Sequence, residues 1–216
     1  ISDAPDIIFT GYGPHNRFGL AVGDAGDVNG DGYDDVIIGA TVNNSGRAYI
    51  YFGGQEMDII PDVVIIGSRI YNNLSFSVSG AGDINNDGFD DVIVGEHTIS
   101  GGSGSGAYIF YGGAQMDNIT DVTLSEENSG DDFGRSVSGA GDVNNDGHND
   151  VIVGARWNNA GGSDCGRAYL YFGGSSMDNI ADVTFTGVAT EDRFGYQVSG
   201  AGDVNGDGYD DVLIGA

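Results

Sequence analysis

The chain has 216 residues, including 40 glycines and three prolines, and its formal charge is −26. All seven basic residues are arginine, which excludes a basic surface for nucleic acid or anionic lipid. The 39% hydrophobic content is enough for a packed core, but no apolar segment is long enough to span a membrane as a helix. The lone Cys165 excludes an internal disulfide.

Taken from the N-terminus, the predicted elements are short strands separated by polar turns. Residues 6–9 form the first predicted strand. A loop rich in Asp, Asn and Gly (27–35) leads directly into an apolar strand at 36–38, and further strands follow at 49–52 and 63–66. These segments are rich in β-branched and aromatic residues, as strands are. No segment shows helical periodicity, so a βαβ fold is excluded.

The same order of segments recurs roughly every 60 residues, which indicates an internal repeat. In each copy, a strand with many small residues, represented by 133–138, precedes the polar loop. The predicted repeats are about 1–56, 57–115, 116–176 and a truncated 177–216.

Four short strands per repeat predict an all-β fold. The strand after each polar loop is apolar at consecutive positions, so we expect both of its faces to be covered. Four-stranded antiparallel sheets that repeat and pack face to face around an axis are the blades of a β-propeller. We therefore predict a β-propeller of about four repeats. A stack of separate sandwiches is the alternative.

The polar loop has the pattern of a calcium site, and it occurs four times. Oxygen-bearing side chains at positions 1, 3 and 5, a glycine at position 6, a backbone carbonyl at position 7 and an Asp at position 9 can surround a hard cation. We expect four Ca²⁺ ions. The predicted ligands, with position 7 acting through its carbonyl, are Asp27, Asn29, Asp31, Tyr33 and Asp35; Asp83, Asn85, Asp87, Phe89 and Asp91; Asp142, Asn144, Asp146, His148 and Asp150; Asp203, Asn205, Asp207, Tyr209 and Asp211.

Two other kinds of loop share part of this pattern. An EF-hand needs a bidentate acid at position 12, where the four copies have Ile38, Val94, Val153 and Ile214, so this interpretation is excluded. The loops could also be simple Asx-rich turns. Three acids placed alike in each copy would then repel one another without benefit, which favours the cation site.

Short motifs flank the loops and carry a family resemblance. Phe18-Gly19 and Gly39-Ala40 flank the first loop, and the second copy reads Phe76-Ser77 and Gly95-Glu96. The other matching pairs are Phe133-Gly134 with Gly154-Ala155 and Phe194-Gly195 with Gly215-Ala216. The chain thus resembles the FG-GAP repeat of the integrin alpha-subunit propeller. This resemblance implies a seven-bladed ring, to which further blades or a neighbouring chain would contribute, and an extracellular or cell-surface location.

Nothing in the sequence indicates catalysis. The three histidines lie at unrelated phases of the repeat, and acidic pairs that recur in every copy are better explained by calcium than by acid–base chemistry.

In the integrin-like family, ligands bind the propeller face opposite the calcium loops. Aromatic and arginine side chains make the best anchors there. The predicted ligand-binding residues are Tyr12, Tyr71, His97, Arg156 and Trp157. Packing of Trp157 and Tyr71 between blades is the alternative.

The sequence is consistent with two functions. The first is an extracellular, calcium-binding recognition or adhesion module that binds protein or glycan and is not an enzyme. The second is a non-catalytic structural or accessory domain of a larger secreted assembly, such as a polysaccharide-degrading enzyme or a surface filament.

Overall fold

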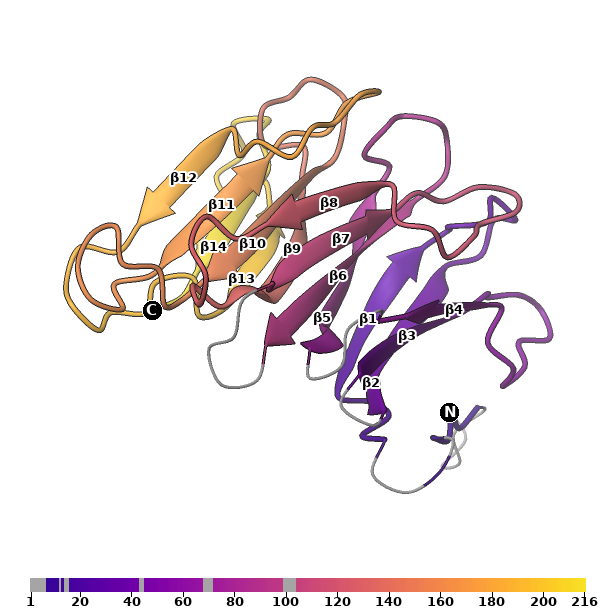
Figure 1. The fold of residues 1–216 in the computed structure, drawn as a ribbon. Helices are drawn as coiled ribbons and strands as arrows, with labels where there is room; N and C mark the ends of the chain where they lie inside the picture. Colours follow the sequence, from indigo (N-terminus) through magenta and orange to yellow (C-terminus); the bar gives the residue numbers. More distant parts are fainter. Residues whose placement is uncertain (1–6, 12, 14–15, 43–44, 68–71, 99–103) are drawn as a thin grey trace.

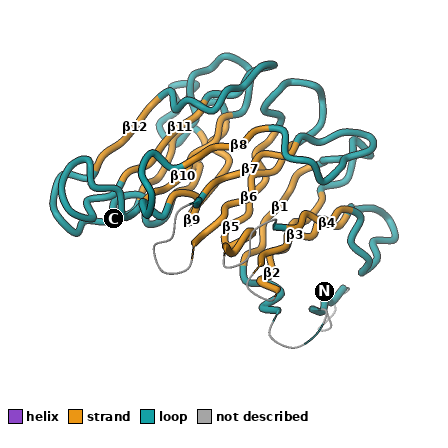
Figure 2. Tube along the Cα trace, viewed as in Figure 1, coloured by secondary structure: helices purple, strands orange, loops and turns teal. Residues whose placement is uncertain are grey.

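The computed structural model describes residues 7–11, 13, 16–42, 45–67, 72–98 and 104–216. Within these ranges the chain forms strands and loops and no helix (Figure 2). The strands are β1 (Ala21–Gly26), β2 (Asp35–Val42), β3 (Ser45–Tyr51), β4 (Val63–Ile66), β5 (Asn72–Gly82), β6 (Asp91–Thr98), β7 (Gly106–Phe110), β8 (Val122–Ser125), β9 (Phe133–Gly141), β10 (Asp150–Ala155), β11 (Arg167–Tyr171), β12 (Val183–Thr186), β13 (Val198–Gly202) and β14 (Asp211–Ile214).

The strands form three four-stranded sheets and one two-stranded sheet. Each four-stranded sheet follows chain order, β1-β2-β3-β4, β5-β6-β7-β8 and β9-β10-β11-β12, and β13 pairs with β14. All pairs of neighbouring strands are antiparallel. The predicted all-β fold with four-stranded antiparallel sheets is therefore confirmed. Figure 1 shows the sheets in a row that follows the chain, with the β1–β4 and β13–β14 sheets toward opposite ends.

The second strand of each four-stranded sheet is central and buried on both faces. Every residue of β10 is buried, and in β6 only His97 is partly exposed. The consecutive apolar residues predicted this, because alternating side chains of a strand point to opposite faces. Ile37 pairs with Ile50, and Ile152 pairs with Leu170, on the third strand of their sheets.

The hydrophobic core lies between neighbouring sheets. One cluster joins Ile37 and Ile50 of the first sheet to Val78 and Val92 of the second. Equivalent clusters lie between the second and third sheets and between the third sheet and β13–β14. The first strands of successive sheets also contact one another, β1 with β5, β5 with β9 and β9 with β13. Neighbouring sheets therefore share their hydrophobic core.

Glycine lets the sheets approach at backbone distance. A Cβ added to Gly154 of β10 would lie 2.1 Å from the carbonyl oxygen of Gly195, in the next repeat. A Cβ on Gly95 of β6 would lie 2.0 Å from the carbonyl oxygen of Gly134. Real Cβ atoms essentially never come within 3 Å of another heavy atom, so these glycines have no room for a side chain. The Gly of one repeat therefore packs on the Phe-Gly pair of the next.

The second repeat aligns differently from the sequence-based expectation. In the third sheet, Phe133 of the Phe-Gly pair lies opposite Ala155. In the second sheet, Leu74 lies opposite Glu96, the residue equivalent to Ala155. Leu74-Ser75 therefore occupies the Phe-Gly position, and the assignment of Phe76-Ser77 to it was wrong. Ser75 has a φ of 63°, in the left-handed region that its glycine counterparts occupy. Its hydroxyl donates to the carbonyl of Arg47 at 2.6 Å, which helps to hold this conformation.

The predicted first strand is also absent among the described residues. Asp6 lies outside the described ranges, and residues 7–11 form no strand. Phe9 instead packs its ring on Tyr51, with centroids 4.4 Å apart, and so covers the outer face of the first sheet. No helix of the described residues has the length and apolar character that a bilayer crossing requires.

Candidate metal loops and the opposite face

The four predicted loops all connect the first strand of a sheet to the second. Because the strands are antiparallel, these loops lie at one end of the sheets. The loops are 27–35, 83–91, 142–150 and 203–211. We call them the acidic loops and number their positions 1 to 9.

Position 1 organises each acidic loop from within. In the first loop, the Asp27 carboxylate accepts hydrogen bonds from the backbone N–H groups of Gly30, Asp31 and Gly32 at 2.8–3.0 Å. Asp203 accepts the same three bonds in the last loop. These bonds hold the pKa of the exposed Asp203 below its usual range, led by the one from Gly208. The loop therefore curls around the side chain of position 1.

Positions 3 and 5 extend this arrangement. The Asn29 side chain accepts the N–H of Asp31 and donates its amide to the Asp31 carboxylate at 3.1 Å. Asp31 in turn accepts the N–H of Tyr33 at 3.0 Å. The second and third loops repeat these three contacts. The predicted side chains at positions 1, 3 and 5 are therefore near neighbours in these loops.

Position 9 lies beneath the loop and is fully buried in the three complete sheets. Asp91 accepts the N–H of Ile84, at position 2, and that of Gly112, just after the third strand, both at 2.8 Å. Burial raises the pKa of Asp91 to about 7 and that of Asp150 to about 6, and the acids at positions 1 and 5 add to the rise. A cation bound nearby would favour the ionised carboxylates and so oppose this rise in pKa.

The ligand atoms that the acidic loops offer are of the type that a hard cation prefers. Each loop offers three carboxylates and one amide, and these oxygen ligands suit Ca²⁺. A carboxylate has about four acceptor sites. Asp31 accepts hydrogen bonds from the Asn29 amide and the Tyr33 N–H, and Asp35 accepts them from the N–H groups of Val28 and Gly53, so each has acceptor sites left. Among the described residues, no three His, Cys, Asp or Glu side chains already form a metal-binding group. Ion binding would therefore draw the carboxylates together.

The turns in the acidic loops use two residues in the left-handed region. Position 6 is glycine, as predicted for the sharp turn, with φ of 88° at Gly32 and 93° at Gly88. Position 4 is also left-handed, with φ of 76° at Gly30 and 59° at Asn86. Gly and Asn are the residues that tolerate this conformation. Position 4 is Gly or Asn in all four copies, and this restriction was the signal for the second turn, which sequence reasoning missed.

Position 8 connects neighbouring acidic loops, and sequence reasoning missed this role too. The Asp90 N–H donates to the carbonyl of Asp27 at 3.2 Å, and the Asp90 carboxylate accepts the N–H of Asp27 at 2.8 Å. Asp210 makes the same pair of bonds to Asp142. Asn149 donates twice to the carbonyl of Asp83. We call these three contacts the interblade clasps.

Glycine makes room for each clasp. A Cβ on Gly26 would lie 2.2 Å from the Asp90 carboxylate, and one on Gly141 would lie 2.0 Å from that of Asp210. These glycines also have positive φ, 72° and 73°. The glycine before each of the first three acidic loops is therefore needed for contact with the next repeat.

Removal of one clasp should destabilise the chain. We expect Asp90→Ala to lower the free energy of unfolding by about 2 kcal/mol, because the Asp27 N–H loses a charged acceptor. Asp34 is the matched control, since it has the same position in the first loop, is exposed and makes no such contact among the described residues. Asp34→Ala should change the free energy by less than about 0.5 kcal/mol. Urea denaturation measures both, and equal effects would contradict the role of the clasp.

The opposite end of the sheets carries a cluster around Asp132. Asp132 precedes β9, is buried and has a φ of 60°. His97 Nδ1 lies 2.5 Å from one Asp132 oxygen, and Arg156 Nε donates to the other at 2.6 Å. The Arg156 guanidinium stacks on the ring of Trp157, 4.4 Å from its centroid. The structure thus brings three of the predicted ligand-binding residues together, whereas Tyr12 and Tyr71 lie outside the described residues.

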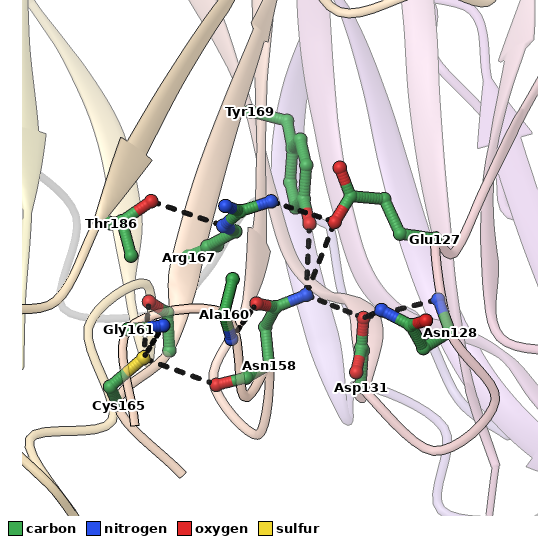
Figure 3. Close-up of polar contacts among 11 residues, drawn as sticks. Glu127, Asn128, Asp131, Asn158, Ala160, Gly161, Cys165, Arg167, Tyr169 and Thr186 are labelled. Carbon is green, nitrogen blue, oxygen red and sulfur yellow. Dashed lines mark hydrogen bonds and ion pairs between the residues drawn. The ribbon is translucent and has the colours of Figure 1, made fainter. Parts of the chain in front are cut away.

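A buried polar network holds the loop that carries Arg156 and Trp157 (Figure 3). Asn158 is fully buried, and its amide donates to Asp131 at 2.6 Å and to the Tyr169 hydroxyl at 3.2 Å. Its carbonyl accepts the Gly166 N–H. Cys165 is buried beside this network, and its thiol donates to the Asn158 carbonyl at 3.4 Å. Asp131 therefore orders the loop on one side while Asp132 faces His97 and Arg156 on the other.

Repeated four-stranded antiparallel sheets with an acidic loop after each first strand define a propeller-type repeat protein. The chain belongs to the FG-GAP repeat family. The FG-GAP-like repeat model matches residues 27–94, and the FG-GAP repeat model matches residues 133–171 and 194–216. Together these ranges cover more than half of the chain. The resemblance inferred from the flanking motifs is therefore confirmed.

Curated relatives are integrin alpha subunits. Integrin alpha pat-2 of Caenorhabditis briggsae is 32% identical over 228 residues, covering 94% of this chain and 18% of the relative. Integrin alpha-5 of Xenopus laevis is 31% identical over 68% of this chain and 15% of the relative. Integrin alpha-7 of Mus musculus is 31% identical over 81% and 15%. The alignments thus span less than a fifth of each relative.

A solved structure shares the fold at low sequence identity. The rhamnogalacturonan lyase PL11 of Bacillus licheniformis matches 93% of this chain and 40% of its own, with a TM-score of 0.52 and 17% identity. At this identity the likeness concerns the fold alone.

Proposed function

We propose that this chain is a calcium-binding recognition module of the adhesion type, acting outside the cell or at its surface without catalysis. The observation that carries the proposal is the fourfold acidic loop in a chain that belongs to the FG-GAP family and aligns with integrin alpha subunits. The chemistry of the loops supports a divalent cation, since every predicted donor is an oxygen.

Each loop would hold one ion through the side chains at positions 1, 3, 5 and 9 and the carbonyl at position 7. In the first loop these are Asp27, Asn29, Asp31, Asp35 and the carbonyl of Tyr33. A bound ion supplies positive charge that offsets the repulsion among three carboxylates. The chain itself orients the ligands, because backbone N–H groups donate hydrogen bonds to the carboxylates at positions 1, 5 and 9. The predicted repeats and a seven-bladed ring remain part of this proposal.

Ligand binding is proposed for the face opposite the acidic loops. His97, Arg156 and Trp157 gather there around Asp132, and a buried network supports their loop. Aromatic and arginine side chains held in fixed positions lose little entropy on binding. The metal loops at the other end would stiffen the sheets that carry this face.

Substitutions at the two ends of the sheets should affect ligand binding and stabilisation by calcium separately. Trp157→Ala should weaken binding about 10-fold or more, because aromatic anchors dominate binding energy, while the stabilisation by calcium stays unchanged. Asp31→Asn should reduce that stabilisation and leave the ligand contacts intact. Tyr209→Ala, an exposed aromatic on the loop side, is the control for Trp157. Binding is measured on a glycan array and a panel of purified secreted and cell-surface proteins.

The outcomes distinguish the proposal from its alternative. If no glycan or protein is retained by the folded, calcium-loaded chain, a structural or accessory role replaces recognition. If Trp157→Ala melts at a lower temperature and binds normally, Trp157 is a packing residue and the binding face lies elsewhere.

A further inference from the structure

Two sets of hydrogen bonds connect the first acidic loop to the second, and the second to the third. The first set is the interblade clasp, in which position 8 of one loop holds position 1 of the loop before it. Asp90 thus bonds to both the N–H and the carbonyl of Asp27. Position 8 lies between positions 7 and 9, which are both predicted ligands. The clasp therefore joins predicted ligands of two loops through a single residue.

The second set runs through a pair of glycines that follows β7. Gly112 donates its N–H to the buried Asp91, at position 9 of the second loop, at 2.8 Å. Gly113 donates to the carbonyl of Val28, at position 2 of the first loop, also at 2.8 Å. The Val28 N–H in turn donates to Asp35, at position 9 of the first loop, at 2.9 Å. Two buried carboxylates in different sheets are therefore connected through one glycine pair.

The same connection continues into the third sheet. Gly173 donates its N–H to Asp150, at position 9 of the third loop, at 2.8 Å. Gly174 donates to the carbonyl of Ile84 at 2.8 Å, and the Ile84 N–H donates to Asp91 at 2.8 Å. The acids at position 9 of the three complete sheets therefore lie along one continuous series of hydrogen bonds. We call Gly112-Gly113 and Gly173-Gly174 the glycine links.

The first residue of a glycine link has no room for a side chain. A Cβ on Gly112 would lie 2.3 Å from the carbonyl oxygen of Asp90 and 2.8 Å from that of Val28. Gly173 has the equivalent two contacts in the third sheet. One contact is to position 8 of its own loop, and the other is to position 2 of the preceding loop. The glycine link and the clasp therefore pack against each other.

The residues at the ends of these connections are those that a bound ion would draw together. Ca²⁺ takes about six to eight oxygen ligands at about 2.3–2.6 Å. No three His, Cys, Asp or Glu side chains of the described residues form such a group, so the carboxylates at positions 1, 5 and 9 must move inward. Positions 1 and 9 are held by the clasps and the glycine links. Inward movement in one loop therefore shifts atoms that are hydrogen-bonded to predicted ligands of its neighbours.

Charge alone would act in the opposite direction. A loop that holds a cation is less negative than the same loop without one, so it attracts a cation to the next loop less strongly. Salt screens this effect over about 8–10 Å, whereas the hydrogen bonds act by direct contact. The sign of the coupling between loops therefore distinguishes the two causes.

We propose that Ca²⁺ binding in one acidic loop strengthens Ca²⁺ binding in the adjacent loops. The clasps and the glycine links are the positioning groups that carry this coupling. The inference rests on the proposed calcium function and adds that the sites fill cooperatively. Coupling should be strongest between neighbours, because each connection spans a single interface between sheets.

The test follows each loop separately by NMR during a calcium titration of the intact chain. The position 6 glycines donate their N–H groups to position 1 and give one signal for each loop: Gly32, Gly88, Gly147 and Gly208. Asp87→Asn removes a predicted ligand of the second loop. We expect the first and third loops of this variant to need roughly 5-fold more calcium for half-saturation, the lower range for coupled sites.

This comparison also separates coupling from charge. The second loop of Asp87→Asn keeps two carboxylates and remains more negative than a wild-type loop that holds Ca²⁺. Charge alone therefore predicts equal or tighter calcium binding in the neighbouring loops of the variant. Glu56→Gln, which removes an exposed acid outside the loops, should change no titration.

Variants at position 8 test the route of the coupling. Asp90→Ala removes the clasp between the first two loops, so the effect of Asp87→Asn on the first loop should fall to about 2-fold or less. Its effect on the third loop should stay the same, because Asn149 makes that clasp. Asp90→Asn should retain the coupling, since asparagine already serves at this position in the third loop. Asp34→Ala, at position 8 of the first loop, should leave it unchanged. Melting curves verify that each variant is folded.

The possible results separate this inference from the function on which it rests. Unchanged or tighter calcium binding in the first and third loops of Asp87→Asn would overturn the coupling and leave the calcium function intact. That comparison does not depend on the folding of Asp90→Ala. If Asp90→Ala abolishes the effect on both neighbours alike, or on neither, the clasp does not carry the coupling. If no glycine signal responds to calcium, the proposed calcium function fails as well.

Discussion

Replacing Gly154 by alanine is expected to lower the free energy of unfolding by about 3 kcal/mol, the upper range for overpacking in a tight core. The added Cβ would lie 2.1 Å from the carbonyl oxygen of Gly195. Both partners are backbone, so no flexible side chain can move aside. Either the third sheet separates from β13–β14, or Gly195 shifts and strains its left-handed φ of 82°. In a chain of this size, the melting temperature should fall by about 6–12 °C.

Gly215 provides a matched control, because it is the same motif position in the next repeat. A Cβ there would meet its nearest neighbour, the Gln197 carbonyl oxygen, at 3.7 Å, an ordinary contact. Gly215→Ala should therefore change the free energy by less than about 0.5 kcal/mol. Denaturant unfolding of both variants gives the comparison. If Gly154→Ala unfolds like the wild type, the sheets do not pack at backbone distance.

Removing calcium should have the second large effect, a fall in melting temperature of about 5–10 °C for each filled site. An ion at 100 times its Kd stabilises the folded chain by about 2.7 kcal/mol, and each kcal/mol corresponds to about 2–4 °C at this size. Affinities of about 10⁻⁴–10⁻³ M, as in extracellular modules, are expected. Calorimetry with calcium and with a chelator measures the shift. Magnesium should substitute poorly, because it demands a smaller octahedral site.

Two single substitutions, each of which removes one negative charge, test whether the calcium effect comes from the acidic loops. Asp87→Asn removes the carboxylate at position 5 of the second loop, which is exposed and can be changed at little structural cost. Glu56→Gln removes an exposed acid outside the loops. Only Asp87→Asn should reduce the calcium-dependent shift. A melting temperature that ignores both calcium and chelator would contradict the metal assignment.

The sequence predicted those features that depend on neighbours along the chain. The apolar strand at 36–38, buried on both faces, and the glycine turn at Gly32 follow from local pattern and backbone freedom. The side chains at positions 1, 3 and 5 also lie together because alternate residues of one turn must. These features need no knowledge of which repeat lies next to which.

The remaining features depend on contacts between repeats. Asp90 meets Asp27 only because the second sheet packs on the first, so the acid at position 8 gave no signal of its own. Leu74-Ser75 was misaligned because a serine in left-handed conformation is held by a carbonyl of the previous repeat. The cluster around Asp132 brings His97 of β6 together with Asp132, just before β9, and Arg156, just after β10. Periodicity within one repeat cannot show such groups.

The interblade clasps give the row of acidic loops a polarity. In the second to fourth loops, the residue at position 8 reaches back to position 1 of the preceding loop, as Asp90 does to Asp27 and Asp210 does to Asp142. A lesion at position 8 is therefore transmitted toward the N-terminus, into the loop of the previous repeat. The loop that carries the lesion keeps its own internal hydrogen bonds. Mechanical tension applied to one repeat would reach position 1 of the upstream acidic loop through this clasp.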